Sequence, residues 1–171
     1  MRPVRGPDFH WLTHRLAVGG AFRPEQAAEL AQQHGISAVV DLRAEDCDDE
    51  ELLRAAGIEL LHLPTPDLLA ASHQHLEQGV AFVREQLARG EKVLIHCQHG
   101  IGRSALLALC VLVDHGFGPL EALCHVKDRR QVVSLSRSQY DGWCAWLQSR
   151  NIEPPDYHSF GCIAYRHLAS G

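Results

Sequence analysis

The sequence has no excess of positive charge and no long apolar run. Its 171 residues contain 16 lysines and arginines against 21 aspartates and glutamates, which gives a formal net charge of −5. A broad basic face is therefore not expected, and nucleic acid is not an expected partner. The longest apolar run, Ala105 to Val113, has nine residues and is too short for a membrane span.

Metal and disulfide motifs are missing as well. The six cysteines form no C-x-x-C pair, and the twelve histidines include no H-E-x-x-H motif. Together with an N-terminus that has no apolar signal region, these features predict a cytoplasmic protein with free thiols, no metal and no cofactor. The length and an apolar fraction of 46% predict one globular domain, which we expect to be a monomer.

Glycines and prolines divide the chain into predicted strands and helices. Strands are expected over residues 15–18, 37–42, 58–63 and 92–96, and helices over residues 24–34, 48–56, 72–89, 103–115, 119–130 and 136–150. This alternation predicts an α/β fold with a central, mostly parallel sheet of four to five strands flanked by helices. We expect an N-terminal arm (1–10), a folded domain (11–150) and a C-terminal extension that packs on the domain or is partly flexible (151–171).

One segment joins a predicted strand to a predicted helix and reads His96-Cys97-Gln98-His99-Gly100-Ile101-Gly102-Arg103-Ser104. The bare spacing C-x5-R is a weak signal, because six cysteines and fourteen arginines in this length give roughly 0.5 matches by chance. Two other matches begin at Cys124 and Cys144, contain no glycine and fall inside predicted helices. Only the match that begins at Cys97 therefore predicts a site.

The residue types of this segment fit the binding of a phosphate group. Gly100 and Gly102 allow successive N–H groups to turn inward at the start of a helix, which makes a cradle for a tetrahedral anion. The same N–H groups stabilise a thiolate on Cys97. Arg103 offers a planar fork for two phosphate oxygens, and Ser104 can donate a hydrogen bond to the sulfur when it leaves. His96 is expected to order the loop through its ring nitrogens.

This segment resembles the signature loop H-C-x-x-G-x-x-R-[ST] of the cysteine-dependent protein tyrosine phosphatase superfamily. Cys97 lies mid-chain, thirty residues after Asp67 in a Pro-rich loop, an order similar to that of the compact dual-specificity branch. The resemblance covers roughly residues 11–150, with further likeness over residues 35–43 and 130–139. It implies a phosphate-binding loop made of Gln98, His99, Gly100, Ile101, Gly102 and Arg103. It also implies that Gln139 lies near the attacking water.

The resemblance implies a reaction without metal. Cys97 attacks phosphorus and forms a phosphocysteine, while the loop and Arg103 bind the phosphate oxygens. Asp67 protonates the leaving oxygen and then activates water. Asp67 is preferred as the general acid because it sits in a loop after a predicted strand. Asp41 lies inside a predicted strand, and the other upstream aspartates are typical of charges at a helix start: Asp46, Asp48 and Asp49.

Two charged groups receive simpler interpretations. The acidic run Glu45 to Glu51 is expected to be the solvated start of a helix. Arg129, Arg130 and Arg137 either line the rim of the site or are surface charges.

The sequence therefore predicts a phosphoric monoester hydrolase, foremost a dual-specificity or tyrosine protein phosphatase that acts on phosphorylated protein or a small phosphomonoester. A phosphoinositide or inositol-phosphate phosphatase is the alternative, weakened because Gln98, His99 and Ile101 stand where such enzymes often carry lysine. An RNA 5′-triphosphatase is disfavoured by the net charge of −5. A non-catalytic phosphate-binding module is disfavoured because binding alone does not need the thiol of Cys97.

Overall fold

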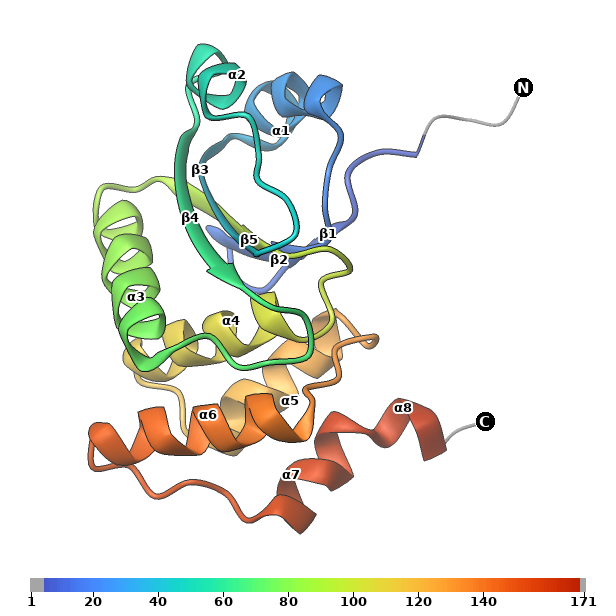
Figure 1. Cartoon of the computed structure of the whole chain (residues 1–171), viewed down its shortest axis with the longest axis vertical. Coiled ribbons are helices and arrows are strands. Elements are labelled where there is room, and N and C mark those ends of the chain that lie inside the picture. Colours follow the sequence, from blue (N-terminus) through green and yellow to red (C-terminus); the bar gives the residue numbers. More distant parts are fainter. Residues whose placement is uncertain (1–4, 170–171) are drawn as a thin grey trace.

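A five-stranded sheet forms the centre of the computed structural model, which describes residues 5–169 (Figure 1). The strand order is β1-β2-β5-β3-β4. The strands are β1 (Phe9–Trp11), β2 (Leu16–Gly19), β3 (Ile36–Arg43), β4 (Glu59–Thr65) and β5 (Lys92–His96). β1 runs antiparallel to β2, while the other three pairings are parallel. The predicted α/β fold with a mostly parallel sheet is confirmed.

Helices cover both faces of this sheet (Figure 1). One face carries α1 (Ala27–His34) and α2 (Glu50–Ala55), and the other carries α3 (His73–Ala88), α4 (Arg103–Asp114), α5 (Pro119–Arg129) and α6 (Arg137–Ser149). The period-two pattern of β3 explains the two layers, since Val39 packs in the cluster of α1 and α2 while its neighbours Ala38 and Val40 pack in the cluster of α4. α4 is buried from Arg103 to Val113, as its nearly continuous apolar sequence predicts.

Side-chain caps set the helix starts that matter for the site. Ser72 accepts a hydrogen bond from the amide of His75 and begins α3, as predicted. Ser136 and Gln139 form a reciprocal capping box at the start of α6. Asp49 caps α2, so this helix begins two residues later than the sequence indicates.

Two further boundaries differ from the prediction. Pro24–Gln26 form a 3-10 turn before α1, so the proline-led segment is not α-helical from its start. β4 continues through Pro64 to Thr65, although the two prolines of this stretch predicted a loop from Pro64 onward. An edge strand tolerates proline because the missing N–H is not needed for pairing on its open side.

Both ends of the described chain pack on the domain. β1 crosses the boundary expected between residues 10 and 11, so Phe9 and His10 belong to the sheet rather than to an arm. The C-terminal extension forms α7 (Tyr157–Ala164) and α8 (Arg166–Ala169). Phe160 is fully buried against Tyr140, with ring centroids 4.7 Å apart. Within residues 5–169, each helix is either too short or too polar to cross a membrane.

Candidate active site

The loop of residues 97–102 connects the carboxyl end of β5 to the first turn of α4, as predicted (Figure 1). The loop after β4, which contains Asp67, passes the same end of α4 (Figure 1). A cavity of about 120 Å³ lies between the two loops. Its lining residues are Asp67, Leu68, Cys97, His99, Ile101, Gly102, Arg103, Ser134 and Gln139. The fold therefore gathers in one cavity seven of the residues predicted for the site.

Cys97 lies at the bottom of this arrangement with only 3% of its surface exposed. Its Sγ is 3.3 Å from Oγ of Ser104, the second residue of α4, within hydrogen-bonding reach of the sulfur. Ser104 itself is fully buried. This distance lets the hydroxyl of Ser104 donate a hydrogen bond to the sulfur of Cys97.

His96 is buried directly before the loop and is held at both ring nitrogens. Nε2 lies 2.5 Å from a carboxylate oxygen of Asp48, and Nδ1 lies 3.2 Å from the carbonyl oxygen of Cys97. Asp48 also pairs with the guanidinium of Arg43 at 3.1 Å. The interpretation of Asp48 as a helix-start charge is wrong, because its buried carboxylate anchors His96 beneath the loop.

Arg103 is held on one edge by a residue that the sequence analysis assigned to solvent. Its Nη1 and Nη2 donate to the two carboxylate oxygens of Glu45 at 2.6 and 2.8 Å. Nη1 also donates to the carbonyl oxygen of Thr65 at 2.9 Å. The hydrogen bonds from Arg103 lower the pKa of Glu45 to about 2, and the same pairing raises the pKa of Arg103. Glu45 is therefore not part of a solvated helix start.

The other edge of Arg103 is free to bind an anion. A guanidinium has five N–H donors, and three of those of Arg103 are used by Glu45 and Thr65. Nε is buried and has no hydrogen-bond partner among residues 5–169. It faces Asp67, whose Oδ1 is 3.6 Å away and which lines the same cavity. The Nε and Nη2 donors left over form a fork whose geometry suits two oxygens of an anion.

Asp67 is the acidic side chain that lines this cavity. It is 63% exposed, and its Oδ1 accepts a hydrogen bond from the amide of Leu68 at 2.9 Å. Leu68 has a φ of 67°, a left-handed conformation that costs free energy for a leucine. The rival Asp41 is fully buried in β3, where its carboxylate is bonded to Arg43.

Three predicted site residues are placed differently from the rest. Gln98 does not line the cavity, and its Oε1 instead lies 3.4 Å from Nη1 of Arg43. Gly100 has a φ of 67° and lies on the rear side of the loop, against Gly19. Gln139 lines the cavity, but its Oε1 caps α6 by accepting from the amide of Ser136. Its Nε2 lies 3.4 Å from the carbonyl oxygen of Leu69.

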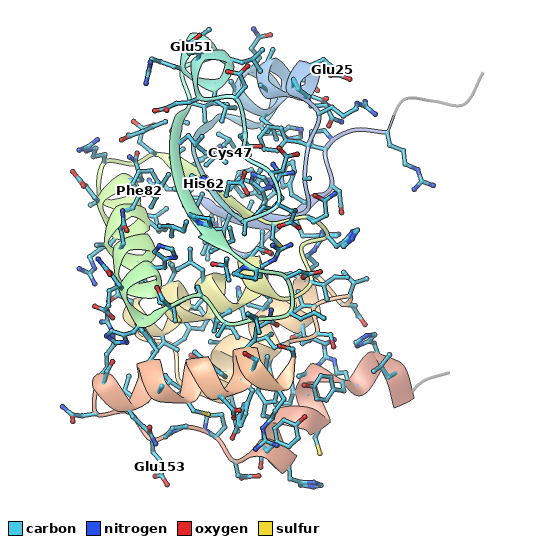
Figure 2. The ribbon with its side chains drawn as sticks, viewed as in Figure 1. Glu25, Cys47, Glu51, His62, Phe82 and Glu153 are labelled. Carbon is cyan, nitrogen blue, oxygen red and sulfur yellow. The ribbon has the colours of Figure 1, made fainter. Side chains whose placement is uncertain are left out.

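Among residues 5–169, two groups of side chains have the elements of a metal site. Asp41, Cys47 and His62 form one, and Asp41, Asp48 and His96 form the other, with their donor atoms within 4.8 Å. Figure 2 shows Cys47 and His62 close together beside β4. In both groups each carboxylate oxygen of Asp41 already accepts two hydrogen bonds: Oδ1 from the amide and Nε of Arg43, and Oδ2 from Nη2 of Arg43 and the amide of Asp48. Asp41 therefore has no free lone pair for a cation.

Comparison with known proteins agrees with this geometry. A family model described as "Polymorphic toxin system, DSP-PTPase phosphatase" matches residues 19–117, more than half of the chain. The mouse (Mus musculus) protein "Phosphatidylglycerophosphatase and protein-tyrosine phosphatase 1" is 27% identical over 149 residues, which cover 81% of this chain and 77% of the relative. The mouse "Dual specificity protein phosphatase 12" is 30% identical over 102 residues, 57% of this chain and 29% of the relative.

Solved structures share the fold. Tk-PTP in its active form superimposes with a TM-score of 0.76 at 28% identity, covering 83% of this chain and 97% of that one. PTPMT1 gives the same TM-score at 23% identity, covering 84% of this chain and 96% of that one. The chain belongs to the dual-specificity branch of the cysteine-dependent protein tyrosine phosphatase superfamily, and it is a phosphatase of that type.

Proposed function

We propose that this phosphatase hydrolyses phosphoric monoesters of proteins through a phosphocysteine on Cys97, with phosphotyrosine as its best substrate. The observation that carries the proposal is the free edge of Arg103. Glu45 fixes the guanidinium on one side, and the buried Nε faces the cavity without a hydrogen-bond partner among residues 5–169, with Oδ1 of Asp67 3.6 Å away. An unpaired buried donor of a charged group costs free energy, which a bound phosphate oxygen would recover.

In the first step the Cys97 thiolate attacks phosphorus in line with the leaving oxygen. The S–P bond forms while the bond from phosphorus to the leaving oxygen breaks, and Asp67 gives its proton to that oxygen. The loop amides and the free edge of Arg103 bind the three equatorial oxygens, where negative charge is held in the transition state. Asp67 is suited to this role because its exposed carboxyl group lines the cavity near Arg103.

In the second step water attacks the phosphorus of the phosphocysteine. The carboxylate of Asp67 takes the proton from water, the S–P bond breaks, and phosphate and the thiolate are released. Ser104 supports this step because its hydroxyl, 3.3 Å from Sγ, donates a hydrogen bond to the departing thiolate. Gln139 lines the cavity, and its Nε2 keeps one hydrogen beyond the contact with Leu69 to orient the water.

The rim of the cavity supports an aromatic phosphoester. Leu68 and Ile101 line the cavity and are 67% and 38% exposed, so apolar surface flanks the phosphate position. Exposed apolar side chains around a polar pocket favour a substrate that has an apolar group next to its phosphate. The phenyl ring of phosphotyrosine meets this condition, whereas the short side chain of phosphoserine does not.

A phosphorylated glycerolipid is the second candidate substrate. It is favoured by relatives whose names include phosphatidylglycerophosphatase, such as the mouse and human proteins. The apolar rim of Leu68 and Ile101 supports it too, because acyl chains place apolar groups near the headgroup. Against an inositol polyphosphate, the loop positions Gln98, His99 and Ile101 carry no fixed positive charge.

A substrate panel tests the proposal. Phosphotyrosine peptide, phosphothreonine peptide, phosphatidylglycerophosphate in mixed micelles and phosphatidylinositol phosphate are compared by kcat/KM, with Cys97→Ser as the inactive control. We expect the highest value for phosphotyrosine peptide. A preference of tenfold or more for phosphatidylglycerophosphate would replace the first candidate by the second, and no turnover of any member would refute both.

A further inference from the structure

Arg130 is buried at the C-terminal end of α5, where only 2% of its surface is exposed. It is neither a rim residue nor a surface charge, the two interpretations that the sequence offers. Its guanidinium donates from Nε to the carbonyl oxygen of Gly100 at 2.8 Å and from Nη2 to that of His99 at 2.9 Å. Arg130 therefore binds the phosphate loop from the side opposite the cavity.

The N-terminal segment closes the other side of this guanidinium. Asp8 accepts from Nη1 and Nη2 through its two carboxylate oxygens, at 3.0 Å each. His10 of β1 accepts from Nη1 through Nδ1 at 2.9 Å. The hydrogen bonds from Arg130 lower the pKa of Asp8 below its ordinary value, so the ion pair persists across the neutral range. Residues before the domain start expected from the sequence thus hold Arg130 in place.

The two carbonyl groups held by Arg130 determine where the next two amides point. In a trans peptide the C=O and N–H groups lie on opposite sides of the peptide plane, and the chain has no cis bond among its described residues. Fixing the carbonyl groups of His99 and Gly100 toward Arg130 therefore turns the N–H groups of Gly100 and Ile101 away from it. That direction is the cavity side of the loop, where phosphate oxygens bind.

The backbone around this contact is closely packed. A Cβ on Gly100 would lie 2.6 Å from the carbonyl oxygen of Gly19 and 2.7 Å from Nη2 of Arg130. A Cβ on Gly20 would lie 3.0 Å from both Oδ2 of Asp8 and the carbonyl oxygen of Gln98. The loop, the end of β2 and the Asp8–Arg130 pair are thus in direct contact without intervening side chains.

We propose that Asp8 and Arg130 are positioning residues that hold the amides of Gly100 and Ile101 toward the phosphate. The proposal rests on the proposed function, since it assigns the cavity to a phosphate group. It makes the N-terminal segment part of the catalytic apparatus, although neither Asp8 nor Arg130 touches the substrate.

The test compares phosphate binding, turnover and stability in four variants. Arg130→Met removes all the N–H donors of the guanidinium and keeps a side chain of similar length. Asp8→Asn weakens the ion pair between Asp8 and Arg130 without shortening the side chain. Arg129→Met is the matched control, because Arg129 is the exposed neighbour of Arg130 at the end of α5 and its Nη1 lies 3.3 Å from Nδ1 of His125. Arg150→Met is the stability control, because it breaks the ion pairs with Asp114 and Glu77 away from the loop.

Three quantities are measured for each variant. The dissociation constant of inorganic phosphate is measured by calorimetry, kcat/KM is measured with p-nitrophenyl phosphate, and Tm is measured by thermal unfolding. We expect Arg130→Met to weaken phosphate binding about tenfold or more and to lower kcat/KM by about 10–100-fold, because misdirected donors stabilise the transition state poorly. Asp8→Asn should show the same pattern at about three- to tenfold. Arg129→Met should match wild type, and Arg150→Met should lower Tm while leaving phosphate affinity unchanged.

The proposal is overturned if Asp8→Asn and Arg130→Met lower Tm but keep the wild-type phosphate affinity and kcat/KM. If Arg130→Met does not fold, Asp8→Asn alone decides by the same two quantities. The proposed function is judged separately, by turnover of the wild type. If the wild type binds phosphate without turnover, the proposed function is refuted, and the role of Asp8 and Arg130 is then judged from the phosphate affinities of their variants relative to wild type. If the wild type binds no phosphate, both proposals are refuted.

Discussion

Replacing Glu45 tests whether this carboxylate orients Arg103 or competes with phosphate for it. Both carboxylate oxygens bind the Nη1–Nη2 edge, at 2.6 and 2.8 Å, and leave the Nε edge toward the cavity. If Glu45 orients the guanidinium, Glu45→Gln should lower activity. If it competes, the same change should raise activity.

The size of the effect follows from the exposure of the pair. A hydrogen bond to a charged group contributes about 1.5–3 kcal/mol when buried. Arg103 is 1% exposed but Glu45 is 44% exposed, so solvent screening reduces the contribution of the pair to about 1–2 kcal/mol. Loss of this orientation energy in the transition state corresponds to a fall in kcat/KM of about 5- to 30-fold.

The assay is the steady-state hydrolysis of p-nitrophenyl phosphate by the wild type, Glu45→Gln and Glu51→Gln. Glu51 is an exposed member of the same acidic run and controls for the loss of one negative charge. We expect wild-type kcat/KM for Glu51→Gln. Unchanged or increased activity in Glu45→Gln would refute the orienting role.

Acid stability gives an independent check on the same pair. The pKa of Glu45 is about 2 in the folded protein against an ordinary value of 4.5, so the folded state favours the charged form. The resulting stabilisation is complete above pH 4.5 and is lost as the pH falls toward about 2. Glu45→Gln should therefore lower the free energy of unfolding at pH 6, by about 1 kcal/mol after screening, and the difference should shrink by pH 2.5. A difference that does not change with pH would contradict the pairing.

Two further substitutions test the acid loop. Asp67→Asn should lower kcat about 10²–10⁴-fold and remove the alkaline fall of the pH–rate profile, because the amide cannot donate an acidic proton; an unchanged profile would place the acid elsewhere. Gly142→Ala should lower kcat while leaving the affinity for inorganic phosphate unchanged. A Cβ on Gly142 of α6 would collide with Ala70 and displace the loop that carries Asp67, but not the loop of residues 97–102. Weakened phosphate affinity would contradict this reasoning.

The fold and the phosphate loop could be predicted because their signals are local. A β-branched, apolar run predicted β3, and the cap residue Ser72 predicted the start of α3. The glycines of the loop distinguished Cys97 from two other matches to the same spacing, and both rivals lie in helices, Cys124 in α5 and Cys144 in α6. Each of these inferences depends on residues a few positions apart.

The supporting residues could not be predicted because their partners are distant in sequence. Glu45 is 58 residues from Arg103, Asp48 is 48 residues from His96, and Asp8 is 122 residues from Arg130. In the sequence, Glu45 and Asp48 belong to an acidic run that is typical of a solvated helix start. One signal was present in the sequence. Glu45 follows β3, and the carboxyl end of β3 lies beside the carboxyl end of β5, where the loop that starts at Cys97 begins. This signal is useful only when the strand order is known, because β3 and β5 become neighbours only in the folded sheet.

The central claim is that Cys97 carries the phosphoryl group, and trapping of the intermediate tests it most directly. The protein is mixed with a ³²P-labelled phosphotyrosine peptide, quenched in acid within milliseconds and digested, and the labelled fragment is identified. The account predicts label on the fragment that contains Cys97, more of it in Asp67→Asn if hydrolysis of the intermediate slows more than its formation, and none in Cys97→Ser. Turnover that persists in Cys97→Ser, or label on any other residue, would contradict it.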